Sequence, residues 1–162
     1  MNEQNVEEIV GGLERLLKEK DHPGLLFDDC RPNSKQQVIQ VDEENARDPK
    51  EEDVWFFGDI HGDLLGMKAA IKYARETSEQ DGKEPLLVFL GDLTDRGPLD
   101  YLVLLEFYSM ILNEEQRNQM CIIAGNHDEC LKYNEERGEF HATVRPAEFS
   151  DWLNEHKEDV WQ

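Results

Sequence analysis

The fold is decided by the stretch VWFFGDIHG at residues 54–62, whose arrangement returns as LLVFLGDLTDRG at residues 86–97 and CIIAGNHD at residues 121–128. Each stretch is a short apolar run that ends on Gly-Asp or Gly-Asn. Between them, residues 63–79 and 99–113 carry apolar side chains at helical spacing. Continuously apolar runs that alternate with helices are typical of buried parallel strands. The sequence therefore predicts an α/β fold, a β-α-β-α-β parallel sheet with flanking helices and with both faces covered.

The spacing of the polar residues that end these runs supports the same topology. Asp92 follows Asp59 by 33 residues, and Asn126 follows Asp92 by 34, each about the length of one βαβ unit. Because such crossovers are right-handed, all three residues are expected at the carboxyl edge of the sheet. In open α/β sheets this edge is where ligands bind.

These residue types suit a pair of metal ions. Neighbouring strands lie about 4.8 Å apart, and the two ions of a hydrolytic centre lie ~3.5–4 Å apart with a carboxylate between them. Asp92, on the middle stretch, can bridge the two ions. Asp59 and His61 can bind one of them, and the side-chain oxygen of Asn126 can bind the other.

A second set of residues suits proton transfer and phosphate binding. His127 is a candidate general acid, and Asp95 is the carboxylate that would keep it charged beside two cations. Arg96 offers a planar cationic fork for two phosphate oxygens. Taken alone, Asp95 and Arg96 could form a surface ion pair, and Asp59 could cap a helix. Three Gly-anchored stretches at the ends of predicted strands favour the catalytic interpretation.

The bulk composition limits the partners and the compartment. With 17 basic and 37 acidic residues the net charge is −20, which argues against nucleic acid and anionic membranes as partners. A phosphate site in such a chain must supply its own positive charge, and metal ions would provide it. Three cysteines without a CxxC pair, and no signal or membrane-spanning segment, lead us to expect a cytoplasmic protein.

The flanks carry less information. Residues 6–20 have the pattern of an amphipathic helix, and the stretch from Gln40 to Asp53 is a polar, mostly acidic arm. We therefore expect residues 1–53 to form an N-terminal helix and arm, separate from a core at 54–162. A helix over residues 147–156 is expected to cover the sheet.

The three stretches resemble the GDxHG, GDxxDRG and GNH(E/D) signatures of the calcineurin-like metallophosphoesterases. Within that superfamily they are most similar to the phosphoprotein phosphatases, which act on serine and threonine, and to their bacterial relatives. The resemblance implies an αββα sandwich, of which this chain would be the N-terminal half. It also implies a phosphoprotein or nucleotide substrate, two divalent ions and attack by a metal-bound hydroxide. Mn²⁺ is the favoured ion, although Fe and Zn suit the same ligands.

The resemblance also implies roles for individual residues. It assigns the metal ions to Asp59, His61, Asp92 and Asn126. It assigns the acid dyad to His127 and Asp95. It assigns phosphate binding to Arg96 and Asn126.

Departures from the family pattern leave the substrate open. Thr94 and Asp128 differ from the usual residues of the protein phosphatases, and GNHD is also similar to bacterial symmetrical diadenosine tetraphosphate hydrolases. The family has further metal-binding histidines downstream, and His141 and His156 lie too near to be assigned to them. Three alternatives therefore stand: a phosphatase, a dinucleoside tetraphosphate hydrolase, and a non-catalytic half-site. The 162-residue chain alone is expected to be feebly active.

Overall fold

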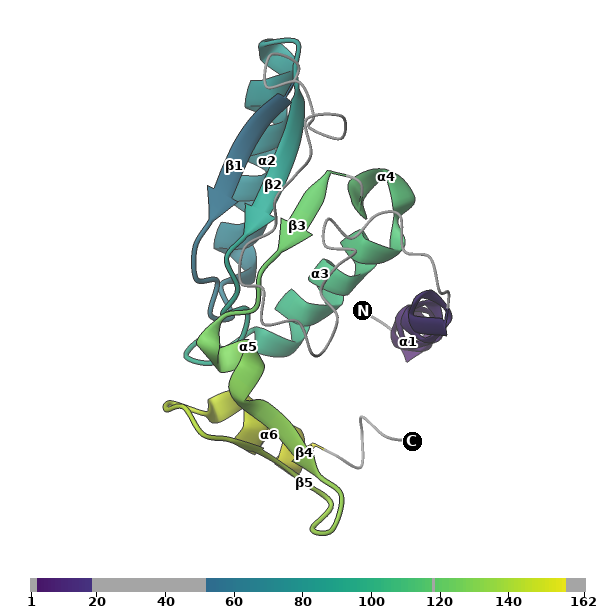
Figure 1. The fold of residues 1–162 in the computed structure, drawn as a ribbon, viewed down its shortest axis with the longest axis vertical. Coiled ribbons are helices and arrows are strands. Elements are labelled where there is room, and N and C mark those ends of the chain that lie inside the picture. Colours follow the sequence, from purple (N-terminus) through teal and green to yellow (C-terminus); the bar gives the residue numbers. More distant parts are fainter. Residues whose placement is uncertain (1–2, 19–51, 118, 157–162) are drawn as a thin grey trace, which may run out of the picture.

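The computed structural model of the chain describes residues 3–18, 52–117 and 119–156. Its centre is a parallel sheet of three strands in the order of the sequence (Figure 1): β1 (Glu52–Phe57), β2 (Glu84–Phe89) and β3 (Met120–Ile122). The connections are helical: α2 (Leu64–Gln80) joins β1 to β2, and α3 (Asp100–Leu112) with the short α4 (Glu114–Arg117) joins β2 to β3. The predicted β-α-β-α-β sheet is confirmed.

Helix α2 shows how local sequence sets the limits of an element. Its first turn is capped by Asp63, whose Oδ1 accepts a hydrogen bond of 2.9 Å from the Gly66 amide. It ends where Gly82 adopts a φ of +68° and the Lys83 amide turns back to the Ser78 carbonyl, at 2.9 Å. Asp59, the other candidate cap, is thereby left free for a different role at the end of β1.

The core lies between the sheet and its two long helices. Alternate side chains of β1 and β2 point toward the helices, and Phe57 and Phe89 stack there at 4.7 Å between ring centroids. Helix α3 contributes Phe107, whose ring meets Phe89 edge-on at 5.1 Å. The fully buried members of this cluster include Met67, Leu87, Phe89, Val103 and Phe107.

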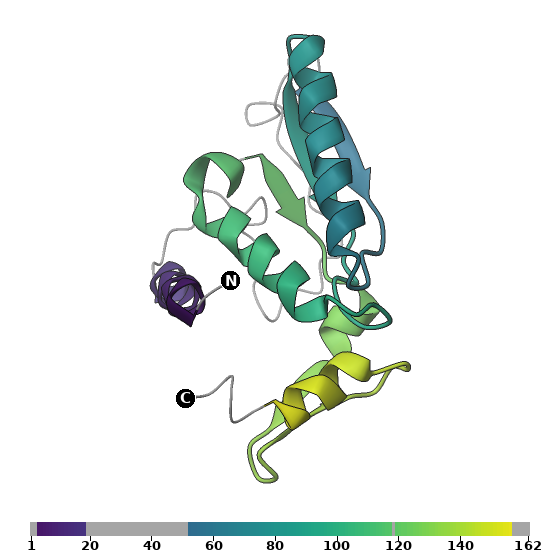
Figure 2. The ribbon, with the colours of Figure 1, turned by 180° about the vertical axis from the view of Figure 1, so that it is seen from behind.

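Only one face of the sheet is covered within the part of the chain that the structure describes. Figures 1 and 2, from opposite sides, place α2 and α3 on the same face. The prediction that both faces are covered was wrong. Strand order follows the sequence, so two right-handed crossovers in one direction leave both helices on one side. The other face exposes apolar side chains: Val54 50%, Phe56 69%, Leu90 43% and Ile123 50%.

Beyond β3 the chain forms a second unit at the carboxyl end of the sheet. Its elements are α5 (Asn126–Cys130), β4 (Leu131–Asn134), β5 (Glu139–Ala142) and α6 (Glu148–Glu155), with β4 and β5 antiparallel. The sequence did not predict this hairpin. Helix α6 packs against β5, where the Asn154 side chain makes two hydrogen bonds to the backbone of Phe140, at 2.7 and 2.8 Å. The prediction that this helix covers the sheet was therefore wrong.

The N-terminal helix, α1, spans Glu3–Lys18 and packs on α3, where Gly12 lies against Leu112. Most of the predicted acidic arm, and Cys30, lie outside the described residues, so the division at residue 53 stays a prediction. Cys121 and Cys130 are buried. No described helix has the length and apolar character needed to cross a membrane.

Candidate active site

The three sequence stretches are held together at the carboxyl edge by backbone contacts. The amides of Ile60 and His61 both donate to the Asp92 carbonyl, at 3.1 and 2.9 Å. Gly97 lies so close that an added Cβ would overlap the His61 carbonyl, and one at Gly91 would overlap the Gly125 amide. These two glycines are therefore required by close approach of the backbones.

Four non-glycine residues at this edge adopt left-handed backbone conformations. Their φ values are +44° at His61, +49° at Asp92, +69° at Asp95 and +69° at Arg96. Each such residue costs on the order of 1 kcal/mol or more relative to a right-handed conformation. Strain of this kind persists where the surrounding structure fixes it, and it is concentrated at functional sites.

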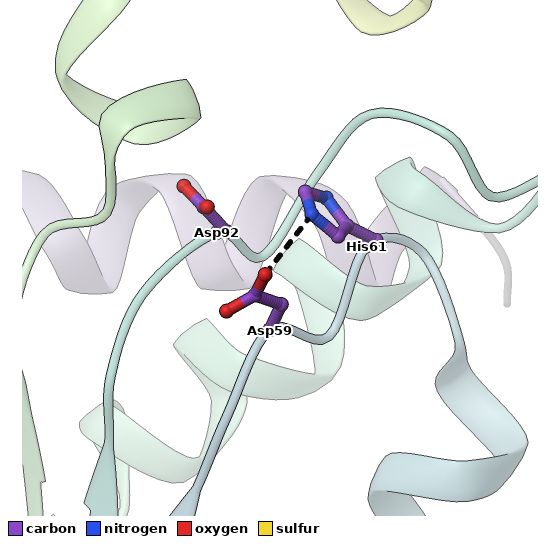
Figure 3. A group of neighbouring side chains, drawn as sticks. All are labelled: Asp59, His61 and Asp92. Carbon is purple, nitrogen blue, oxygen red and sulfur yellow. Dashed lines mark ion pairs between the residues drawn. The ribbon is translucent and has the colours of Figure 1, made fainter.

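Asp59, His61 and Asp92 form a cluster that we call the metal triad, and their candidate ligand atoms all lie within 4.8 Å of one another (Figure 3). His61 Nδ1 lies 2.8 Å from the Thr94 carbonyl, which can only accept, so Nδ1 carries the proton. Nε2 then holds a lone pair, is buried, and has no hydrogen-bond partner among the described residues. It faces Asp59 Oδ2 at 3.5 Å. Two acceptors with no donor between them fit a cation.

The carboxylate of Asp92 connects the metal triad to the third stretch. Asp92 is buried, and its Oδ1 accepts from the His127 amide at 2.8 Å. Asp128 makes the reverse contact, from the third stretch to the second. The sequence analysis noted it only as a departure from the family pattern. Its Oδ2 accepts from the amides of Asp92 and Gly125, at 2.6 and 2.9 Å, and its Oδ1 accepts from Leu93 at 3.1 Å. Its position three residues after Gly125 matches a helix-capping carboxylate, a signal that could have identified it.

His127 and Asp95 form a second cluster, which we call the acid pair. His127 Nδ1 lies 2.7 Å from Asp95 Oδ2, and the two side chains are 0% and 5% exposed. Asp95 Oδ1 accepts from the Phe149 amide at 2.9 Å, in the first turn of α6. Both oxygens of Asp95 are thus bonded to other groups, so the alternative that Asp95 and Arg96 form a surface ion pair is wrong. The role of Phe149 was missed because a backbone amide leaves no signal in the side chains.

Arg96 lies between the acid pair and solvent. Its guanidinium Nη2 is 3.3 Å from His127 Nε2, and because a guanidinium only donates, Nε2 is the acceptor in this contact. The rings of His127 and His61 meet edge-on at 5.1 Å between centroids. The metal triad and the acid pair are therefore adjacent parts of one site.

Comparison with known proteins agrees with this geometry. Residues 53–159 match the model of the calcineurin-like phosphoesterase family. The chain belongs to this family. Over 78 residues it is 33% identical to Shewanella-like protein phosphatase 1 of Plasmodium berghei (strain Anka), an alignment that covers 44% of this chain and 21% of that protein. The chain thus spans about a fifth of the length of the curated relative it matches. No solved structure matches.

The phosphoesterase family is metal-dependent, and the metal triad is a candidate for its metal site. Asn126, the remaining predicted ligand, is exposed and is the first residue of α5. His141 is exposed on β5, whereas His156 stacks on Trp152 with 4.4 Å between ring centroids. Neither histidine belongs to the triad. The roles of the individual site residues remain predictions.

One further carboxylate lies near the acid pair. Asp100 is 8% exposed, and its Oδ1 has no hydrogen-bond partner among the described residues. Burial raises the pKa of Asp100 from 3.8 to about 6; a backbone hydrogen bond from Asp95 opposes this, and the charges of Asp95 and Glu148 add to it. A buried carboxyl group beside two other acids is a destabilising arrangement that needs a reason.

Proposed function

We propose that this site hydrolyses phosphoesters, and that its substrates are proteins phosphorylated on serine or threonine. The observation that carries the proposal is the juxtaposition of the acid pair with the metal triad, with Arg96 beside the acid pair. A hydrolytic site of this kind needs an acid for the leaving oxygen, a cationic hold on phosphate and a place for metal ions. All three lie together at the carboxyl edge of the sheet.

The metal ions would be held by Asp59 and His61 on one side and by Asn126 on the other, with Asp92 shared between them. The orphaned Nε2 of His61 supports this assignment, and the mixed imidazole, carboxylate and amide set suits Mn²⁺ as well as Fe or Zn. Divalent ions bound there would activate water and neutralise charge on the phosphate oxygens. We propose Mn²⁺ as the first ion to test.

Arg96 and His127 would exchange partners when a phosphate enters. Phosphate oxygens are stronger acceptors for a guanidinium than a neutral imidazole is, so Arg96 would leave His127 Nε2 and bind the substrate. Nε2 is then free to hold a proton and to deliver it to the leaving serine or threonine oxygen. Asp95 stabilises the imidazolium, and the Phe149 amide keeps Asp95 in place.

A phosphoprotein is favoured over a dinucleoside tetraphosphate because the Plasmodium relative is named a protein phosphatase. A cytoplasmic location is part of the same proposal, since three cysteines without a CxxC pair suit a reducing compartment.

The test is phosphate release by the purified chain with excess Mn²⁺, first from p-nitrophenyl phosphate and then from a phosphoserine peptide and diadenosine tetraphosphate. We expect metal-dependent release that is slow beside the ordinary ~1–10³ s⁻¹ and that disappears in Asp92→Asn. Glu129→Gln, an exposed acid on α5, is the matched control and should retain activity. Release that is equal in wild type and Asp92→Asn would contradict the proposal, and preference for the dinucleotide would correct its substrate.

A further inference from the structure

A pocket of about 270 Å³ lies beside Arg96, between the start of α3 and the start of α6. We call it the acidic pocket, and it is lined by residues 97–102 together with Glu148 and Trp152. Glu148 joins it to the candidate phosphate site, because its Oε2 accepts from the Arg96 backbone amide at 3.4 Å. A group bound in the pocket would therefore lie near Arg96 and near a phosphate that Arg96 binds.

The charges of the pocket are unbalanced. Asp100 and Glu148 both line it, and no basic residue does within the part of the chain that the structure describes. Asp100 is 92% buried, and its Oδ1 has no hydrogen-bond partner among the described residues, whereas Glu148 is exposed. Burial is the main reason that the pKa of Asp100 is raised, and the negative charges of Asp95 and Glu148 add to it. A cation between Asp100 and Glu148 would offset these negative charges.

The remaining walls of the pocket are apolar and rigid. The ring of Tyr101 stacks on Trp152 with 5.2 Å between centroids, and Leu99 and Leu102 extend the same surface. Trp152 is itself fixed by stacking on His156. An apolar wall beside carboxylates matches a side chain with a methylene stem and a charged head, and this is the chemistry of arginine and lysine.

We propose that the acidic pocket binds an arginine or lysine side chain of the phosphoprotein substrate, close in sequence to the phosphorylated residue. The proposal rests on the proposed function and adds a substrate preference to it. The phosphate would be held by Arg96, and the basic side chain would lie between Asp100 and Glu148, with its stem against Tyr101 and Trp152. The net charge of −20 would favour a basic side chain over a neutral or acidic one at this position.

The first experiment measures binding without turnover. The chain is titrated with N-acetyl-arginine amide and, separately, with the neutral isostere N-acetyl-citrulline amide, while NMR follows the indole N–H of Trp152, which Trp152→Phe identifies. We expect a saturable shift with the arginine compound and about three- to ten-fold weaker binding in Glu148→Gln and in Asp100→Asn. Asp151→Asn, an exposed acid on the same helix as Glu148, removes the same charge and should bind as wild type does.

Two results of this titration would overturn the proposal. Equal binding of citrulline would show that the pocket does not distinguish charge. An equal loss in Asp151→Asn would show that only the overall acidic field attracts the cation.

The second experiment links the pocket to the candidate active site. With Mn²⁺ present, calorimetry compares phosphoserine peptides that carry either arginine or citrulline within three residues of the phosphoserine. We expect the arginine peptides to bind about three- to ten-fold more tightly at one or more positions, and this ratio to approach one in Glu148→Gln. A ratio near one in wild type would overturn the preference. Failure of the phosphatase assay would instead remove the proposed function and leave the arginine titration valid.

Discussion

The acid pair and the metal triad lie side by side, yet the chain completes only the first of them. His127 bonds to Asp95 through Nδ1 and to Arg96 through Nε2, and the other oxygen of Asp95 is held by a backbone amide. In the metal triad Asp59 is 61% exposed, and His61 Nε2 is buried with no hydrogen-bond partner among the described residues. Folding alone therefore builds the acid pair, whereas a bound cation would complete the metal triad as we propose. This difference predicts which substitutions act on chemistry and which act on metal affinity.

The largest effect is expected from His127→Asn. Loss of a positioned acid typically lowers kcat by about 10²- to 10⁴-fold, while the affinity for Mn²⁺ should stay close to wild type because the metal triad is intact. The loss should be smaller for p-nitrophenyl phosphate than for phenyl phosphate, since p-nitrophenolate needs little protonation. The measurement is kcat on both substrates, with metal affinity by calorimetry. An equal loss on both would show that His127 is not the acid.

Metal binding should also stabilise the fold, because the triad gains its missing partner. At 100 times the dissociation constant, Mn²⁺ should raise the free energy of unfolding by about 2.7 kcal/mol. Denaturant titration with and without Mn²⁺ measures this, and a chelator should reverse it. In Asp92→Asn the increment should be mostly lost, and in His127→Asn it should persist. An undiminished increment in Asp92→Asn would place the metal elsewhere.

Asp128→Ala tests the connection between the two clusters. It removes the acceptor of three backbone amides, those of Asp92, Leu93 and Gly125. Residues that orient a metal ligand are typically worth 10- to 100-fold in metal affinity, and we expect a loss in that range. Glu129→Ala is the neighbouring control. If metal affinity is unchanged while stability falls, Asp128 is structural only.

The smallest effect is expected from Asp100→Asn, and it depends on pH. Because the pKa of Asp100 is raised to about 6 by burial, the folded state holds a proton that the unfolded state has lost between about pH 4 and 6. Wild-type stability therefore falls as the pH rises through this window. Asp100→Asn should remove that fall and gain roughly 1 kcal/mol above pH 6, after allowance for solvent screening. Chemical denaturation at pH 4.5 and 7 measures it, and Asp151→Asn should show no such gain.

Much of the fold could be predicted because its signals are local. Apolar runs that end on Gly-Asp mark β1 and β2, and Asp92 follows the middle strand as expected. The face that the helices cover was not predictable from spacing, because it depends on strand order as well as on handedness. The four-residue strands β4 and β5 are too short to give a clear pattern. The sequence analysis missed Asp128 and the Phe149 amide because their hydrogen bonds involve backbone amides. It missed Asp100 because burial of a carboxyl group cannot be read from the sequence.

The four residues with left-handed backbone conformations at the carboxyl edge should respond differently to selection for stability and to selection for activity. Glycine would relax the backbone at His61, Asp92, Asp95 and Arg96, and would remove a predicted metal ligand or catalytic group each time. A library of variants selected for thermal stability alone should therefore accumulate glycine or asparagine at these positions. The same library selected for phosphate release should return to the present residues. At this edge the chain retains side chains that selection for stability alone would discard.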